Sequence, residues 1–504
     1  MRTKKSLLNL ATGLAGQAIA LLASLVLRVV MTRSMDTAYL GLSGLFTNIL
    51  SMLSLVELGV GPAITFSLYK PLAEHDVEKT KSLMRLFRRA YCTIGMVILL
   101  VGFLFTPLYP LFIKDTSGID HLDVIYWLYL INTGISYFYS YKVTLIIADQ
   151  NQYVKNIGHY TAYLIMHVLQ AVILLVTRNY VLFLICQVLC TFGENLVLSR
   201  VADNMYPFLR DKNVQPLKKE DTAPIVRNIR AMLCHNIGNM AVNSTDNLLV
   251  SRFLGLAVSG IYSNYAMIIL AIKNILARAF DAVLASVGNL HAVGSAEHLR
   301  KVYDRLFFLA FWLFGLCSIC LGCLLQPFIR LVFGEAFLLD GLTLLMLTIS
   351  FYVSGMRTSV LNVMRAAGGL YYRDWAKPIA EAVVNLAASI LLLQRFGIAG
   401  VFMGTIISSL LVGTWVEAYF VHKDMLKSGL GEYVRQYACY LASAAVAGAI
   451  AYALTGMISG AGIVALLLRA LVCFVSVNGV FALLYIRNEH LAYYCGLTLR
   501  IIKR

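Results

Sequence analysis

Charged residues are scarce in this sequence of 504 residues: only 13% are Asp, Glu, Lys or Arg, whereas 59% are hydrophobic. Soluble domains carry about 25% charged residues, so this composition excludes an ordinary soluble fold and is typical of a chain embedded in a bilayer. No segment is long and polar enough to form a separate soluble domain. Almost all of the chain is therefore expected to lie in the membrane.

Two chemical signatures are also missing. The ten cysteines are scattered, mostly within apolar runs, and they show no disulfide spacing. The phosphate-binding motif GxxxxGKS or GxxxxGKT of nucleotide hydrolases does not occur. We therefore expect no cofactor, and we expect any energy that the protein uses to come from a Na+ or H+ gradient, from the membrane potential or from a partner protein.

Acidic residues are in deficit, with 26 Asp and Glu against 42 Lys and Arg, which gives a formal net charge of +16. In a soluble protein this excess would suggest nucleic acid. In a membrane protein it is explained better by topology, because cytoplasmic loops collect Lys and Arg. We expect membrane lipids, and not nucleic acid, as partners.

The apolar runs predict about fourteen transmembrane helices, since a spanning helix needs ~20 apolar residues. Their approximate ranges are 8–31, 40–67, 91–113, 123–147, 157–177, 180–199, 226–250, 258–288, 306–331, 341–363, 378–394, 396–421, 436–458 and 463–486. An even number of helices places both termini on one side of the membrane.

The basic residues support this topology. Thirty Lys and Arg residues fall in the alternate connections that share a side with the termini, and the other side holds six, namely Arg33, Lys114, Arg178, Arg252, Arg330 and Arg395. A missed or invented helix would have destroyed this alternation. Both termini are therefore predicted to be cytoplasmic.

The sequence also repeats itself at a nearly constant offset. A shift of 219 residues places Tyr39-Leu40-Gly41-Leu42 on Val258-Ser259-Gly260-Ile261, and a shift of 218 places Tyr153-Val154-Lys155 on Tyr371-Tyr372-Arg373. Helices 1–6 and 7–12 are therefore interpreted as one fold used twice. Because six is even, the two copies are parallel repeats, an arrangement that binds substrate between its halves.

These features predict an all-α polytopic membrane protein with two parallel six-helix repeats and two C-terminal helices. The expected divisions are an N-lobe at 1–199, a polar cytoplasmic linker at 200–225, a C-lobe at 226–421, and helices 13 and 14 with a cytoplasmic tail at 422–504. The linker is read either as a joint between moving halves or as a tether.

Several ionisable residues fall deep within the predicted spans, where nine charges facing lipid would cost on the order of 25 kcal/mol. They are Arg28, Glu57, Lys142, Asp246, Lys273, Arg278, Asp281, Arg357 and Arg469. We expect most of them to face a hydrated interior or each other. Candidate pairs are Arg278 with Asp281, three residues apart on one helix, and Arg28 with Asp246 on repeat-equivalent helices.

The deep charges include more cations than acids. Lys142, Lys273 and Arg357 have no obvious acidic partner in the sequence, which suggests an anionic ligand such as phosphate or carboxylate. Arg28, Lys142, Lys273, Arg278 and Arg357 are therefore the candidate substrate-binding cations. For each of them there is an alternative: the side chain could form a structural ion pair, or it could extend to the membrane–water interface.

The remaining candidate residues are acids and tyrosines. Glu57, Asp246 and Asp281 are candidates for coupling to an ion or for pairing with the cations. Tyr137, Tyr139 and Tyr141 lie in the deeper part of the fourth predicted helix, where their rings could stack on sugars or simply pack. No metal site is expected.

At this point the sequence resembles the bacterial polysaccharide flippases of the multidrug/oligosaccharidyl-lipid/polysaccharide exporter superfamily. The resemblance covers essentially the whole chain. It is carried by the helix count and by two stretches, Glu57-Leu58-Gly59-Val60-Gly61 and the pattern Asp246-Asn247, Leu254-Gly255 and Gly260-Ile261-Tyr262-Ser263.

The resemblance implies movement of an undecaprenyl-pyrophosphate-linked oligosaccharide across the bacterial cytoplasmic membrane by alternating access, for cell-surface polysaccharide biosynthesis. Cavity cations would receive the pyrophosphate, and a polysaccharide polymerase or glycosyltransferases would be partners. The related peptidoglycan-precursor flippases carry basic residues on the first and eighth helices, where this chain has Arg28, Lys273 and Arg278.

Two other functions remain open from the sequence. A multidrug exporter of the same superfamily would favour an acidic, aromatic cavity, whereas the deep charges here are mostly cationic. A polytopic polysaccharide polymerase or glycosyltransferase would usually need a long outer loop, and the predicted outer loops are short. We therefore expect a transporter and not an enzyme.

Overall fold

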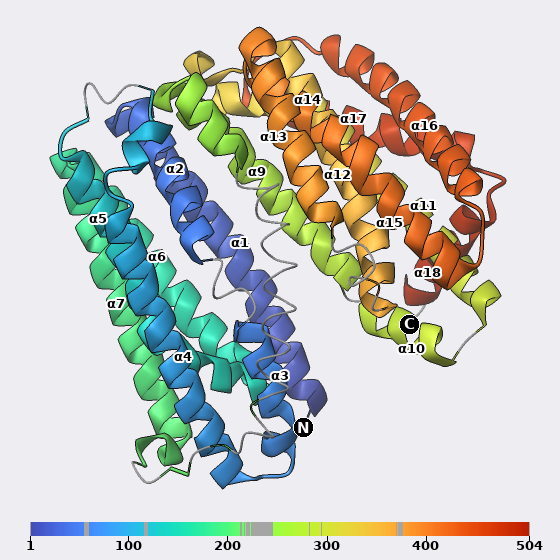
Figure 1. The fold of residues 1–504 in the computed structure, drawn as a ribbon. Coiled ribbons are helices and arrows are strands. Elements are labelled where there is room, and N and C mark those ends of the chain that lie inside the picture. The colour runs from blue at the N-terminus through green and yellow to red at the C-terminus, as the bar shows by residue number, and fades with distance from the viewer. Residues whose placement is uncertain are drawn as a thin grey trace. The chain divides into compact units, whose positions relative to one another are not determined.

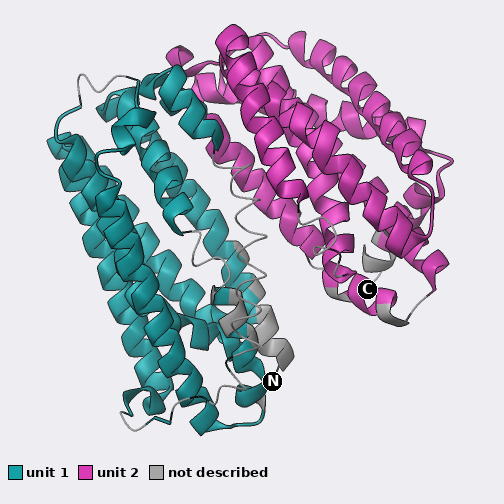
Figure 2. Cartoon of the chain, in the orientation of Figure 1, with its two compact units in different colours: residues 1–263 teal, residues 264–504 magenta. Residues whose placement is uncertain are grey.

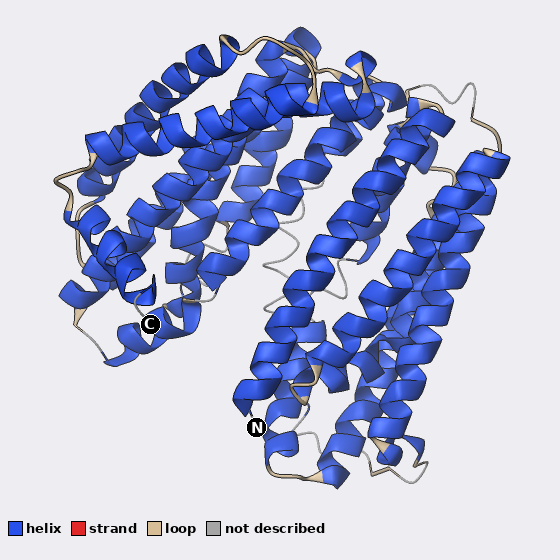
Figure 3. Cartoon of the chain, turned by 180° about the vertical axis from the view of Figure 1, so that it is seen from behind, coloured by secondary structure: helices blue, strands red, loops and turns tan. Residues whose placement is uncertain are grey.

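The computed structural model describes residues 2–54, 60–114, 119–211, 214–215, 217, 222, 245–281, 283–293, 295–368, 370 and 376–502. Within these residues every regular element is a helix (Figure 3). Ten of the described helices are long and apolar enough to cross a membrane. Helices satisfy their backbone hydrogen bonds internally, as hydrocarbon requires. The predicted all-α polytopic membrane fold is confirmed.

The chain forms two compact units, residues 1–263 and 264–504 (Figure 2). The division falls inside helix α9 (Leu256–Asp281), so this helix contributes to both units. The expected lobes at 1–199 and 226–421, the linker at 200–225 and the segment at 422–504 stay predictions. Much of the expected linker, and residues 223–244 as a whole, lie outside the described residues.

Unit 1 is a bundle in which α1 packs along α6, α4 along α5, and α5 along α7 (Figure 1). Besides the first part of α9, its main helices are α1 (Arg2–Ser34), α2 (Thr37–Leu53), α3 (Val60–Ala73), α4 (Val77–Leu104), α5 (Leu122–Ala148), α6 (Gln152–Thr177) and α7 (Tyr180–Met205). Short 3₁₀ turns, η2 (Tyr109–Phe112) and η3 (Pro207–Arg210), follow α4 and α7.

In unit 2, α13 packs closely along α14, and α11 contacts α12, α16 and α17. After α9 the order is α10 (Leu284–Val293), α11 (Ala296–Phe333), η4 (Glu335–Phe337), α12 (Gly341–Ala367), α13 (Lys377–Phe396), α14 (Ile398–Ser408), η6 (Ser409–Gly413), α15 (Thr414–Phe420), η7 (Val421–Leu426), α16 (Leu430–Gly456), α17 (Ile463–Leu484) and α18 (Glu489–Ile502). The stretch from α14 to η7 is one continuous span with two π-helical segments.

Most predicted spans coincide with helices, and the differences have local causes. The predicted span 91–113 corresponds to α4, which begins at Val77 because the Asp76 side chain caps it by accepting a 2.9 Å hydrogen bond from the Lys79 amide. The span 40–67 corresponds to α2 and α3, separated by residues outside the described ranges, and 226–250 lies mostly outside them. Helix α18 occupies what was expected to be a tail.

The internal repeat has a direct structural counterpart in unit 1. The backbone amide of Gly260 lies 3.0 Å from where a Cβ atom of Gly41 would be, and the Gly41 amide lies 3.0 Å from a Cβ of Gly260. Each such Cβ would overlap a carbonyl oxygen of the other helix, Leu256 for Gly41 and Thr37 for Gly260. These pairs are related by the 219-residue shift, so the contact is reciprocal: each residue meets the equivalent residue of the other helix.

This contact can be tested with alanine substitutions. Gly41→Ala and Gly260→Ala should each destabilise the protein by roughly 1–3 kcal/mol, because the new methyl group would meet backbone that cannot rotate away. Thermal unfolding in detergent would measure the loss. Gly193→Ala in α7 is the matched control, since no atom lies within 4 Å of its Cβ position. Equal melting temperatures for all three variants would contradict the contact.

Candidate functional site

Unit 1 contains two of the candidate cations, and each is bound by the protein. The half-buried Arg28 on α1 donates from Nη2 to the Ser263 hydroxyl on α9. Lys142 on α5 donates to Asp203 at 2.7 Å and to Ser199 at 2.9 Å, both on α7. The expectation that Lys142 lacks an acidic partner is therefore wrong. Ser199 and Asp203 are four residues apart, which places both on the α7 face that meets α5.

Two of the other unit 1 candidates remain predictions. Asp246 is half-buried in the helical residues 245–253, and its pairing with Arg28 stays a prediction. Glu57 lies outside the described residues.

The three candidate tyrosines of α5 differ in their surroundings. Tyr137 and Tyr141 are buried, and Tyr139 makes an edge contact with Phe192, with 6.2 Å between the ring centroids. Only Tyr141 of the three is among the residues that line a described cavity, the one beside Lys142. Sugar stacking stays a prediction for this group.

In unit 2, Lys273 and Asp281 line one cavity of about 440 Å³ between α9, α10, α11 and α12. Its neutral polar lining comes from Asn274, Thr358, Ser359 and Asn362, and its apolar lining includes Leu270, Phe280 and Phe314. The cavity therefore offers one ammonium group, one carboxylate and several amides and hydroxyls. Arg278 is exposed and is not among the lining residues, and its pairing with Asp281 stays a prediction.

Arg357 does not share this cavity. At about 100° per residue, it lies on the opposite side of α12 from the cavity-lining Gly355, Ser359 and Asn362. There its guanidinium binds Glu381 of α13 and lies 3.8 Å from Glu417 of α15. The expectation that Arg357 has no acidic partner is therefore wrong. Both acids belong to other helices, α13 and α15, which tertiary packing brings next to this side of α12.

Arg357 belongs to a buried charge cluster that combines three cations with two carboxylates. Glu417 accepts a 2.9 Å bond from Arg365 and also binds Lys377, which in turn lies 2.9 Å from Glu381. The side chains of Arg365, Lys377, Glu381 and Glu417 are only 2–5% exposed. The cluster therefore joins α12, α13 and α15 through charge-assisted hydrogen bonds in a medium that water barely enters.

Sequence reasoning did not find this cluster. Glu381 and Glu417 lie near the ends of the predicted spans 378–394 and 396–421, and Lys377 lies just outside the first of them, so none of the three is among the deep charges. The one local signal was the spacing of Lys377 and Glu381, four residues apart on α13. In the structure, Gly413 leaves room for the cluster, because a Cβ atom there would overlap the guanidinium of Arg357.

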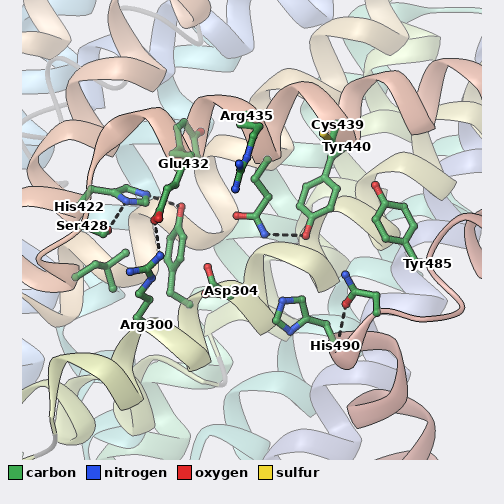
Figure 4. A pocket seen from close by; sticks show the side chains of 15 residues that line it. Arg300, Asp304, His422, Ser428, Glu432, Arg435, Cys439, Tyr440, Tyr485 and His490 are labelled. Atoms are coloured by element: carbon green, nitrogen blue, oxygen red, sulfur yellow. Dashed lines mark hydrogen bonds and ion pairs between the residues drawn. The ribbon is translucent and has the colours of Figure 1, made fainter.

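A second cavity in unit 2, of about 330 Å³, lies where α11, η7, α16 and the residues after α17 meet (Figure 4). Arg300 and Glu432 form an ion pair across it. His422 is held from both sides, with Nδ1 2.8 Å from the Ser428 hydroxyl and Nε2 3.3 Å from the Tyr303 hydroxyl. These contacts hold Glu432 and His422 in place within the lining. No group of three or more His, Cys, Asp or Glu residues in the described ranges could hold a metal ion.

No model of a known protein family matches the sequence, and a search of curated proteins finds no match. Solved structures do match. The lipid II flippase MurJ, in an inward closed conformation, superposes with a TM-score of 0.67 and 12% identity, covering 95% of this chain and 99% of that chain. A multidrug resistance MATE family transporter of the MOP superfamily, in an inward-facing conformation, superposes with a TM-score of 0.57 and 14% identity. This match covers 80% of this chain and 95% of that chain.

A third match is a MOP superfamily transporter from Pyrococcus furiosus, described as having a binding pocket of reverse polarity. It gives a TM-score of 0.51 and 14% identity, covering 85% of this chain and 97% of that chain. All three proteins are transporters. At these identities the likeness establishes the fold, so the chain has the polytopic α-helical architecture of MOP superfamily transporters.

The charge cluster predicts a large stability difference between two glutamates. Glu417→Gln should cost roughly 3–5 kcal/mol, because it removes the carboxylate that three buried cations share. Glu432→Gln, at a side chain that is 52% exposed and paired with Arg300, should cost less than about 1 kcal/mol. Melting temperatures in detergent measure both. A Glu417→Gln protein as stable as the control would show that the cluster is not structural.

Proposed function

We propose that the chain is a flippase that moves an undecaprenyl-pyrophosphate-linked oligosaccharide across the bacterial cytoplasmic membrane by alternating access, for cell-surface polysaccharide biosynthesis. The physical problem fits the fold. A large, polar, anionic headgroup cannot cross hydrocarbon unaided, whereas its lipid tail can stay in the bilayer. A fold shared over 95% of the chain with a lipid II flippase supports this proposal.

The observation that carries the proposal is the lining of the cavity at Lys273. An ammonium group suits phosphate oxygens, and the neighbouring amides and hydroxyls of Asn274, Thr358 and Asn362 suit sugar hydroxyls, which both donate and accept hydrogen bonds. The side chain of Phe314 offers an apolar surface to sugar faces. This combination matches a glycan attached to a phosphate.

The cavity lining weighs against a drug exporter, and the fold weighs against an enzyme. A cavity for cationic drugs is expected to carry more acidic than basic residues. Here the lining has one acid, Asp281, and one base, Lys273. A polymerase or glycosyltransferase would share the glycan but not the transporter fold. We include such enzymes as proposed partners, and we propose coupling to a Na+ or H+ gradient or to the membrane potential.

Transport by a Lys273 variant tests the proposal. The protein would be reconstituted in vesicles with an undecaprenyl-pyrophosphate oligosaccharide that carries a fluorophore on its sugar, and a membrane-impermeant quencher would report which leaflet holds it. Lys273→Gln should slow the exchange roughly tenfold or more, because a hydrogen bond to a charged group contributes about 1.5–3 kcal/mol. Lys273→Arg should retain much of the rate.

The matched control is Arg395→Gln, which removes an exposed cation at the end of α13, away from the cavity lining. It should leave the exchange rate unchanged. The proposal would fail if the wild-type protein moved no labelled lipid, or if the Lys273 and Arg395 substitutions had the same effect. Melting temperatures of both variants would show that any loss is not caused by unfolding.

A further inference from the structure

A third cavity, in unit 1, has a charge pattern that the proposed transport does not use. It measures about 460 Å³ and lies between the first turns of α4, the end of α5, the end of α7 and η3. Its α4 face carries Lys81, Met84, Arg85 and Arg88, at the spacing i, i+3, i+4 and i+7 that puts side chains on one side of a helix. This is the basic end of α4, which the loop charges predict to be cytoplasmic.

The cavity has more cations than acids. Its lining includes the five cations Lys81, Arg85, Arg88, Lys142 and Arg210, and the two acids Asp203 and Asp211. Each acid is already bound by one lysine, with Lys142 to Asp203 and Lys81 to Asp211 both at 2.7 Å. Within the described residues, neither acid forms an ion pair with any of the three arginines.

The arginines keep donors that the protein does not use. Arg85 donates from Nη1 to the Val214 carbonyl at 2.7 Å, and Arg210 donates to Asn204 at 2.8 Å. Arg88 makes no ion pair or hydrogen bond with the part of the chain that the structure describes. A guanidinium has five N–H donors, so most of these remain available to a ligand.

The bound lysines form a sheltered wall of the cavity. The side chains of Lys81 and Lys142 are only 12% and 17% exposed. An anion beside them would be partly shielded from water. Its attraction to the arginines would therefore be stronger than at an open surface, because the local dielectric constant is lower. The lining also contains Met84, Phe208 and Leu209, so part of the wall is apolar.

We propose that this cavity binds the phosphate group of an anionic membrane lipid. Arginine forks match phosphate oxygens in pairs, and basic pockets between helices at the cytoplasmic face are suited to lipid headgroups. The apolar residues would contact the glycerol and the first carbons of the lipid chains. The volume lies within the range of small-ligand pockets, about 300–1,000 Å³. This site would be occupied whether or not the chain transports a glycan.

Native mass spectrometry of the full-length protein tests the proposal. The protein would be purified in detergent with phosphatidylglycerol or with phosphatidylcholine, and the fraction of chains that retain each lipid would be measured. Wild type should retain phosphatidylglycerol preferentially. Arg85→Gln/Arg88→Gln should reduce that retention roughly tenfold, because two charge-assisted contacts are lost. Both arginines are exposed, so the fold should persist.

Arg89→Gln is the matched control, since Arg89 is an exposed arginine of the same helix that does not line the cavity. It should retain the lipid as wild type does. Equal losses in the control and the double variant, or equal retention of both lipids by wild type, would overturn the proposal. Competition by inorganic phosphate distinguishes a lipid headgroup from a free phosphate ion as the ligand. If millimolar phosphate displaced all bound lipid, the pocket would be assigned to soluble phosphate, and the lipid proposal would be wrong.

Discussion

The buried charge cluster of unit 2 is held together by the ion pairs of the Glu417 carboxylate. This carboxylate binds Arg365 and Lys377 and lies 3.8 Å from Arg357, all at side chains that are almost completely withdrawn from solvent. Removing one charge from such a group leaves the others uncompensated in a medium of low dielectric constant, which is far more costly than losing an exposed ion pair. Helices α12, α13 and α15 are thereby linked to one another by ion pairs.

Three of the cations within the predicted spans lie in two different kinds of surroundings. Lys142 and Arg357 are bound to carboxylates of neighbouring helices, so their charge is largely used within the protein. Lys273 lines a cavity together with Asp281 and several neutral polar groups, and α12 has this cavity on one side and the charge cluster on the other. The two sides of α12 therefore present different surroundings, one a polar cavity and the other a buried set of ion pairs.

The repeat imposes a second constraint, through backbone contact instead of charge. Gly41 and Gly260 occupy equivalent positions in the two halves of the sequence, and each lets the other helix approach closely enough for backbone to meet backbone. Small residues serve this purpose in membranes, where no hydrophobic effect drives helices together and close packing has to replace it. The identity of these two residues across the repeat therefore has a geometric cause.

The sequence by itself determined the class of fold, most of the spans and the repeat. Hydrocarbon forces the backbone into helices of a minimum length, and that constraint is written locally in runs of apolar residues. Local pattern was less informative at helix ends, where the Asp76 cap extends α4 and where α18 forms in the expected tail. Only the tertiary structure decided the partners of the buried charges. Arg357 and Glu417 are sixty residues apart, and Lys142 and Asp203 sixty-one, so their pairing depends on how helices pack, which no local pattern encodes.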